Sequence, residues 1–253
     1  MTEQISFKPI GTIYSCFGQK LGIPRQPGLA SSARALLVIP YTQSAQIKES
    51  VRGLEGFSHI WVIFVFHRNN ITKPVGLVRP PRLGGEKKVG TFASRSPNRP
   101  NPIGLSVVRL LTVRDRGNRI ELEVQGGDFL DSTPVLDIKP YLPYADRIDD
   151  AKAAWVAPIE DQLMQVHFTH KAKQAISDVA EKKADIIFNC IKESLSLDPR
   201  PSFSKKSSKI NANRKWSSLF FGFDVSWSID ENLCIVEDAE LKDAEVLEKL
   251  MPQ

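Results

Sequence analysis

Two arginines stand among three prolines in residues 90–106, and a stiff cationic loop of this kind suits recognition of an anion. The prolines at positions 97, 100 and 102 fix φ at about −65° and remove backbone donors, so we expect an ordered, extended loop. The guanidinium of Arg95 or Arg99 would project from it and lose little entropy on pairing with an anion. The alternative is a surface connector stiffened only for stability, which has little need of two arginines.

Other residues with reactive side chains also lie in loops or at strand ends. Arg25 lies between two prolines, and a third proline-arginine loop covers residues 79–85. Asp128 and Asp131 follow two glycines, and acids in such a loop could accept a proton or bind hydroxyl and amino groups. His67 ends a long apolar run and opens into a basic segment. It could be a neutral, hydrogen-bonded core histidine or a functional residue at the strand terminus.

Short apolar or alternating runs separated by glycine and proline must position these loops. We expect strands at residues 7–14, 35–39, 58–67, 88–92, 105–113, 120–125 and 135–141, with one short helix at 44–51. The run 58–67 is too uniformly apolar for an edge and should be central. The pattern predicts a mainly β fold with an N-terminal β-barrel over residues 5–150. No strand leads into a Gly-x-Gly-x-x-Gly turn, so the Rossmann dinucleotide fingerprint is absent.

The second part of the chain has a different pattern. Residues 171–197 carry apolar side chains at helical spacing, and residues 216–229 predict one or two strands. Between them, residues 200–215 hold six basic residues and no acid, which indicates a flexible basic loop. The acidic tail that follows should end in a short surface helix. We therefore expect a small α+β domain over residues 155–240.

Composition limits the class of protein. With 253 residues and 42% hydrophobic content, the chain can form one large domain or one with a small companion. The longest apolar run, residues 60–66, is too short to span a bilayer, and no signal peptide is visible, so no membrane role is expected. The three cysteines are far apart without metal-ligand spacing, which predicts a cytoplasmic protein and no metal site.

Positive charge is concentrated in the first part. Lysine and arginine exceed aspartate and glutamate by seven over residues 1–150, whereas acids exceed bases by two in the remainder. Residues 68–99 alone hold eight basic residues and one acid. This distribution indicates a polyanionic partner, although a solvated surface without a partner would show the same charge.

Several loop motifs together resemble the TrmO family, also called the TsaA-like domain. The motifs are Ile23-Pro24-Arg25-Gln26-Pro27-Gly28, Gly53-Leu54-Glu55-Gly56-Phe57-Ser58-His59-Ile60-Trp61, Val78-Arg79-Pro80-Pro81-Arg82-Leu83-Gly84-Gly85, Ala93-Ser94-Arg95-Ser96, Arg99-Pro100-Asn101-Pro102-Ile103-Gly104-Leu105-Ser106 and Thr133-Pro134-Val135-Leu136-Asp137-Ile138-Lys139-Pro140-Tyr141. The resemblance covers about residues 5–150 in the family's order. Residues 198–201 and 225–227 are similar to its C-terminal extension.

The resemblance implies a β-barrel methyltransferase that uses S-adenosylmethionine, acts on tRNA and commonly forms a homodimer. The implied target is the exocyclic N6 of threonylcarbamoyl-adenosine next to the anticodon. Family cofactor positions fall here on Pro24, Arg25, Gln26, His67, Arg68, Arg95, Leu105, Asp128, Phe129, Leu130 and Asp131. The family usually has glycine where this chain has Ser132. If that position needs positive φ, serine costs about 1 kcal/mol or the turn shifts slightly.

The implied chemistry assigns several catalytic candidates. A urea-like nitrogen has a delocalised lone pair, so a base near it would help and positioning would supply much of the rest. His67 could accept the proton or orient the methionine group. Asp128 and Asp131 could act as bases or bind the cofactor's ribose or amino group. Arg95, like Arg25, could pair with a carboxylate of the cofactor or of the substrate.

Two other functions are compatible with the sequence. The first is a non-catalytic RNA-binding module whose proline loops hold the anticodon stem without a cofactor. The second is a methyltransferase of this fold that acts on a small molecule. The RNA interpretation accounts for both basic segments, residues 73–88 and 200–215, as contacts to tRNA phosphates.

Overall fold

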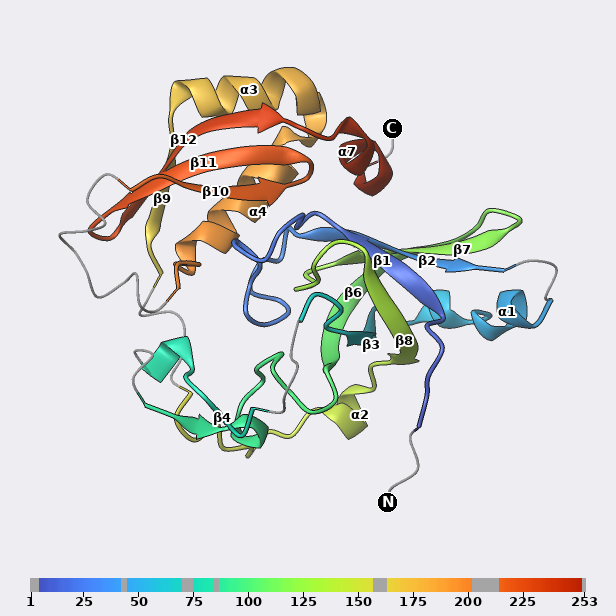
Figure 1. Ribbon diagram of the computed structural model, residues 1–253. Coiled ribbons are helices and arrows are strands. Elements are labelled where there is room, and N and C mark those ends of the chain that lie inside the picture. The colour runs from blue at the N-terminus through green and yellow to red at the C-terminus, as the bar shows by residue number, and fades with distance from the viewer. Residues whose placement is uncertain are drawn as a thin grey trace.

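The computed structural model describes residues 5–41, 45–69, 75–83, 87–156, 163–201 and 214–251. Its main element is a closed barrel of six antiparallel strands, which confirms the predicted mainly β fold (Figure 1). Around the barrel the order is β1 (Gly11–Ser15), β2 (Arg34–Pro40), β7 (Arg119–Gln125), β6 (Ile103–Asp115), β3 (His59–Val65) and β8 (Thr133–Pro140).

The central position predicted for the most apolar strand is confirmed. β3 pairs with β6 on one side and β8 on the other. Ile60, Val62 and Phe64 point into the barrel and are buried, while the alternate side chains are only half-buried. β-branched and aromatic residues at period two therefore fill the barrel interior from this strand.

Short elements connect the strands. They are α1 (Ala45–Ser50), β4 (Leu77–Val78), β5 (Val89–Gly90) and α2 (Pro143–Asp146). The strand expected at residues 88–92 is wrong beyond Gly90, because a 3-10 turn takes over at Thr91–Ala93. The buried Thr91 hydroxyl donates to the Val75 carbonyl at this point, which fixes the chain in a turn before the prolines begin.

A second sheet forms the C-terminal part. Its order is β10 (Trp216–Phe220), β11 (Phe223–Asp230), β12 (Leu233–Leu241) and β9 (Gln165–Phe168), and β9 runs parallel to β12. Its helices are α3 (His170–Ala180), α4 (Ala184–Ser196) and α7 (Ala244–Leu250). α3 packs along β12, and α7 lies between this sheet and the barrel, where it contacts β1 and β2 (Figure 1).

Two C-terminal predictions need correction and one is confirmed. The single helix expected over residues 171–197 is two helices, because Glu181 adopts a left-handed φ of 49° and turns the chain. The acidic tail contains a full strand, β12. The terminal helix is confirmed, although its Leu247 and Leu250 are buried rather than on the surface.

One hydrophobic cluster joins the outside of the barrel to the second sheet, and a separate cluster fills the barrel interior. Cys16 and Phe17, just after β1, are fully buried with residues of α4, β10 and β11. The Phe17 ring meets Phe220 edge to face with centroids 5.9 Å apart, and the Sγ atoms of Cys16 and Cys190 are 3.9 Å apart. Burial of aromatic rings on both sides makes this a packed interface rather than a loose contact between two domains.

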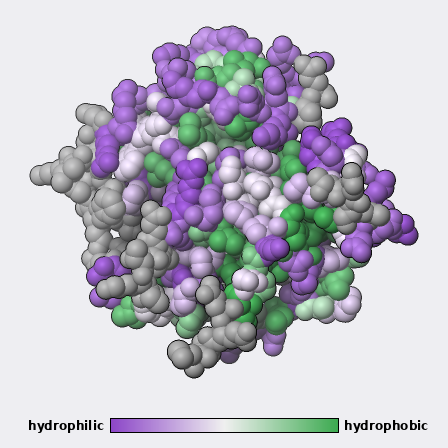
Figure 2. All heavy atoms as spheres, turned by 45° about the vertical axis from the view of Figure 1, so that its right-hand side comes forward, coloured by the Kyte–Doolittle hydropathy of each residue, from purple (hydrophilic) through white to green (hydrophobic). Residues whose placement is uncertain are grey.

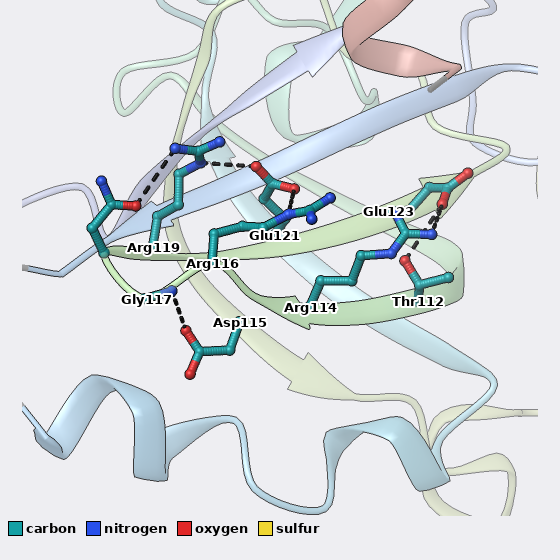
Figure 3. Close-up of polar contacts among 9 residues, drawn as sticks. Thr112, Arg114, Asp115, Arg116, Gly117, Arg119, Glu121 and Glu123 are labelled. Carbon is teal, nitrogen blue, oxygen red and sulfur yellow. Dashed lines mark hydrogen bonds and ion pairs between the residues drawn. The ribbon is translucent and has the colours of Figure 1, made fainter. Parts of the chain in front are cut away.

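A cluster of ion pairs stabilises the hairpin that β6 and β7 form (Figure 3). Glu121 is buried and accepts hydrogen bonds from Nε of Arg116 and Nε of Arg119, both at 2.8 Å. Burial alone raises the pKa of Glu121, but the two arginine hydrogen bonds outweigh it and hold the pKa below its usual value. Most arginines of this hairpin are therefore neutralised by acids on the same strands.

The surface is mixed in character. On the face that Figure 2 shows, hydrophobic residues reach the surface in separate patches between hydrophilic ones. Large exposed apolar side chains on the barrel part include Phe7, Leu77, Phe92, Ile103 and Leu105. Over the described ranges, no helix is long and apolar enough to cross a membrane.

Candidate active site

The two arginines of the proline loop have different surroundings. Arg99 folds back and donates from Nη1 to the carbonyls of Ser94, at 2.7 Å, and Thr91, at 3.3 Å. Its guanidinium also lies 5.8 Å from the centre of the Phe92 ring. The expectation that Arg99 projects toward a ligand is therefore wrong: its side chain satisfies carbonyls of the loop and holds the loop in shape.

Arg95 is exposed and reaches a different loop. Its Nη1 donates to Oε1 of Gln26 at 2.5 Å, which joins two segments that are 69 positions apart in the chain. Next to Gln26, Arg25 is exposed and Pro24 is buried. The structure thus brings the first and the principal proline-arginine loops to one side of the barrel.

Asp128 is an acid close enough to Arg95 for the guanidinium to act on its carboxylate. Its Oδ1 accepts a hydrogen bond of 2.6 Å from the Ser106 hydroxyl, which points inward from β6. Burial raises the pKa of Asp128 above its usual value, against the Ser106 hydrogen bond and the Arg95 guanidinium, which both lower it. The Arg95 guanidinium, the Gln26 amide and the Asp128 carboxylate therefore lie near one another. Together they supply one positive charge, one negative charge, and hydrogen-bond donors and acceptors.

Asp131 is held by the protein itself. Its Oδ1 accepts from the Ser15 backbone N–H at 2.9 Å, and its Oδ2 accepts from the Ser132 hydroxyl at 2.8 Å. Its own N–H donates to the Phe17 carbonyl at 2.9 Å. These bonds attach the loop before β8 to the end of β1, so the observed contacts of Asp131 are those of a positioning residue.

Ser132 has a positive φ of 62°. This is the left-handed backbone that the family's usual glycine at this position suggested. A non-glycine residue pays about 1 kcal/mol for this backbone, and the hydroxyl bond to Asp131 offsets part of that cost.

We expect Ser132→Gly to be more stable than Ser132→Ala by about 1 kcal/mol, because alanine keeps the strained φ and loses the hydroxyl. Urea unfolding of the two variants and the wild type measures the difference. Equal stability of the glycine and alanine variants would show that the turn relaxes and that no strain is stored at this position.

His67 lies just after β3, half-buried. Its Nδ1 is 3.5 Å from Oγ1 of Thr133, and that hydroxyl donates its proton to the Leu130 carbonyl at 2.5 Å. A Thr133 lone pair therefore faces Nδ1 and can accept its proton in the tautomer protonated at Nδ1. Burial, and after it the charge of Arg68, lowers the pKa of His67 below its ordinary value, so the ring is neutral at pH 7. Nε2 is buried and has no hydrogen-bond partner among the described residues.

A pocket of about 430 Å³ opens beside His67. It is lined by Gly18, Gln19, Lys20, His67, Arg68 and Leu130. The loop that supplies Leu130 also carries Asp128, so the pocket and the Arg95 cluster are neighbours along one loop.

Two predicted contacts differ in exposure. Leu105 on β6 is 54% exposed and offers an apolar surface. Phe129 is fully buried inside the barrel, where its ring meets Phe64 edge to face at 5.0 Å. Only the backbone of Phe129 could therefore contact a ligand.

Some predicted RNA contacts cannot be placed. Lys73 and the lysines Lys205, Lys206 and Lys209 lie outside the described residues, as does the side chain of Arg82. Lys87 and Lys88 are described and exposed.

Sequence reasoning did not select Ser106, Thr133 or Lys20 as site residues. Ser106 could have been found as the single polar side chain at an inward position of β6. Lys20 had no such signal, because its place beside His67 depends on how the loop after β1 folds.

Comparisons with known proteins agree with this geometry. A family model described as the tRNA-methyltransferase O N-terminal domain matches residues 12–147, and one for the TrmO C-terminal domain matches residues 161–242. The chain is 39% identical over 231 residues to the tRNA (adenine(37)-N6)-methyltransferase of Escherichia coli K12, covering 90% of this chain and 95% of that one. It is 40% identical over 229 residues to a putative S-adenosylmethionine-dependent methyltransferase of Pseudomonas aeruginosa, covering 90% and 93%. A crystal structure of TrmO superposes with a TM-score of 0.74 at 34% identity, covering 94% of this chain and 99% of that one.

Proposed function

Because this chain belongs to the tRNA-methyltransferase O family, we propose that it transfers a methyl group from S-adenosylmethionine to N6 of the adenosine at position 37 of tRNA. The proposal is supported by similarity over nearly the full length to the tRNA (adenine(37)-N6)-methyltransferase of Escherichia coli K12. It is also supported by the cluster of charged loops at one side of the barrel. We propose further that the accepted adenosine carries a threonylcarbamoyl group on N6.

The residues around Arg95 fit the methyl donor chemically. S-adenosylmethionine presents a carboxylate, an ammonium, ribose hydroxyls and an adenine ring, and it supplies an electrophilic methyl group. Arg95, oriented by Gln26, suits the carboxylate, and Asp128 suits the ammonium or the ribose hydroxyls. Leu105 offers an exposed apolar surface for the adenine ring. Arg25, Pro24 and the backbone of the loop from Asp128 to Asp131 complete the proposed site.

Proton removal falls to His67 in this proposal. The N6 atom of a threonylcarbamoyl-adenosine is part of a urea, so its lone pair is delocalised and loss of the proton makes it a better nucleophile. In the tautomer protonated at Nδ1, Nε2 of His67 has no hydrogen-bond partner among the described residues, and it could take the proton once substrate binding exposes it. Asp131, whose oxygens are engaged by Ser15 and Ser132, keeps the adjoining loop in place.

Mass spectrometry of tRNA nucleosides tests the function directly. Purified protein is incubated with S-adenosylmethionine carrying a deuterated methyl group and with tRNA that has or lacks the threonylcarbamoyl group. Label on N6 of the modified adenosine is expected only with the modified tRNA. Label on unmodified adenosine would contradict the threonylcarbamoyl substrate, and label only on free nucleosides or metabolites would contradict a tRNA substrate.

We expect His67→Gln to lower the single-turnover rate of methyl transfer by about 10²-fold, because general-base catalysis typically contributes 10² or more. In the wild type, the rate should stay on a plateau as the pH falls to about 6.5, the ordinary pKa of histidine, and decline only below it. Protonation of the lowered-pKa ring removes the base, so this acid limb should vanish in His67→Gln.

Arg68→Gln is the matched control for that pH profile. Removing the guanidinium should raise the pKa of His67, so the acid limb should move to higher pH. An acid limb that survives in His67→Gln would assign proton removal to another group, of which Asp128, with its raised pKa, is the next candidate.

The proposal also assigns roles to the two parts of the chain. Residues 5–150 would hold the cofactor and the reacting atoms, and residues 155–240 would contribute a tRNA contact. The exposed Lys87 and Lys88 are candidates for phosphate contacts. Cell fractionation should find the protein in the cytoplasm with its tRNA, a setting that its three buried free thiols fit.

A homodimer is part of the proposal. The outer faces of β3 and β6 form an apolar strip in which Ile63 lies opposite Leu105 and Val65 opposite Ile103. Ile103 is 40% exposed, and a second copy would cover it. Light scattering at micromolar concentration should give twice the mass of one chain, and a monomer mass would contradict this part.

A further inference from the structure

Phe92 is a large aromatic side chain that the fold leaves in solvent. It is 81% exposed, although it lies in the ordered 3-10 turn at Thr91–Ala93. The Ser94 hydroxyl donates to the Thr91 carbonyl at 2.9 Å and closes this turn. The Arg99 guanidinium, which binds carbonyls of the same loop, lies 5.8 Å from the centre of the Phe92 ring. The ring is therefore exposed on a backbone that the loop's own hydrogen bonds hold in one shape.

The charge around Phe92 favours a polyanionic partner. Residues 87–101 contain four basic side chains and no acid, and Lys87, Lys88 and Arg95 among them are exposed. β4 and β5, which precede Phe92 in the chain, lie apart from the barrel strands at the lower left of Figure 1. An exposed ring among cations is the combination that binds single-stranded nucleic acid, because the ring stacks on a base while the cations meet phosphates.

Another exposed aromatic residue has different surroundings. Tyr144 on α2 is 87% exposed, but residues 141–150 hold three acids and one base, and that base, Arg147, pairs with Asp149. Exposure alone therefore does not indicate an RNA contact, whereas the surroundings of Phe92 do. A second copy of the chain suits the Phe92 surface less well, because a symmetric contact there would bring like charges together.

We propose that Phe92 stacks on one of the two bases that flank the target adenosine in the tRNA. The inference rests on the proposed function. An enzyme that acts on a base takes it out of the stack, so the neighbouring base loses a stacking partner that an aromatic side chain can replace. Phe92 and Arg95 are three positions apart, which keeps their Cα atoms within about 11 Å. Stacked neighbouring bases are about 3.4 Å apart, so a base next to one held at the Arg95 cluster is within reach of Phe92.

The test measures binding of the full-length protein to a synthetic anticodon stem-loop that carries the threonylcarbamoyl-adenosine, by fluorescence anisotropy. Phe92→Ala should raise the Kd of the stem-loop about tenfold, the usual effect of losing one stack of a base on an aromatic ring, and Phe92→Trp should restore wild-type affinity. The salt dependence of Kd should be unchanged in Phe92→Ala, because loss of an apolar contact releases no counterion. Tyr144→Ala is the matched control and should bind as the wild type does.

Two abasic stem-loops locate the contact. One lacks the base on the 5′ side of the target adenosine, and the other lacks the base on its 3′ side. With one of them, the wild type and Phe92→Ala should bind within about twofold of each other, because the base that Phe92 contacts is already missing. A tenfold difference that persists with both abasic RNAs would overturn the inference.

Two further measurements on Phe92→Ala separate RNA from other partners of this ring. The Kd of S-adenosylmethionine, measured by calorimetry without RNA, and the mass from light scattering should both equal those of the wild type. A weaker cofactor affinity would assign Phe92 to the cofactor, and a change from dimer to monomer would assign it to a second copy. Either result, or an unchanged Kd for the stem-loop, overturns the inference. Binding is measured without methyl transfer, so a wild type that binds the stem-loop but transfers no methyl group would contradict the proposed function and leave the stacking contact standing.

Discussion

Replacing Arg95 by alanine should lower kcat/KM for methyl transfer by about 10³-fold, a loss of about 4 kcal/mol of transition-state stabilisation. The arginine is exposed and shares its hydrogen bond with Gln26, and its charge also acts on Asp128, so one substitution removes two links of the cluster. The same exposure means that folding should be nearly unaffected. Steady-state kinetics with modified tRNA and thermal unfolding of the same preparations measure both effects.

The controls for Arg95→Ala separate charge from geometry. Arg109 is an exposed arginine on β6, and Arg109→Ala should keep kcat/KM within about threefold of the wild type. Gln26→Ala leaves the guanidinium in place but unoriented, so its loss should be smaller, about tenfold. An Arg95→Ala variant with wild-type turnover would remove this residue from the mechanism.

The barrel could be predicted from sequence because its signals are local. The apolar run that became β3 alternates inward and outward, and glycine and proline mark most ends of the strands. The strand at residues 233–241 was missed for a physical reason. Its outward positions hold Glu237 and Glu240, so the segment reads as a solvated acidic tail although Cys234 and Val236 are buried. The break between α3 and α4 had no glycine or proline to mark it.

The site could be predicted only in part. Proline-arginine motifs identified the loops, but the contact of Arg95 with Gln26 depends on the closure of the barrel, which spacing along the chain does not reveal. Arg99 has the same residue type and the same loop as Arg95, and only the structure shows that it serves the loop's own carbonyls. Lys20 shows the same limit, because its position depends on the C-terminal sheet.

Phe220→Ala should destabilise the whole protein by about 3–5 kcal/mol, which for a chain of this size corresponds to about 10 °C in Tm. The Phe220 side chain is fully buried, contacts Phe17 from the barrel and packs in a core shared by both parts. Because this cluster joins the second sheet to the outside of the barrel, urea unfolding should remain a single transition when followed by circular dichroism and by tryptophan fluorescence.

The same substitution should loosen the loop that bears Lys20, since β10 holds that loop through Gly18 and Gln19. Val179→Ala, at a 43% exposed position on α3, is the matched control and should change stability by less than about 1 kcal/mol. Two separate transitions, with the barrel as stable as in the wild type, would show that the second sheet folds independently. In that case the C-terminal sheet could not be what positions Lys20.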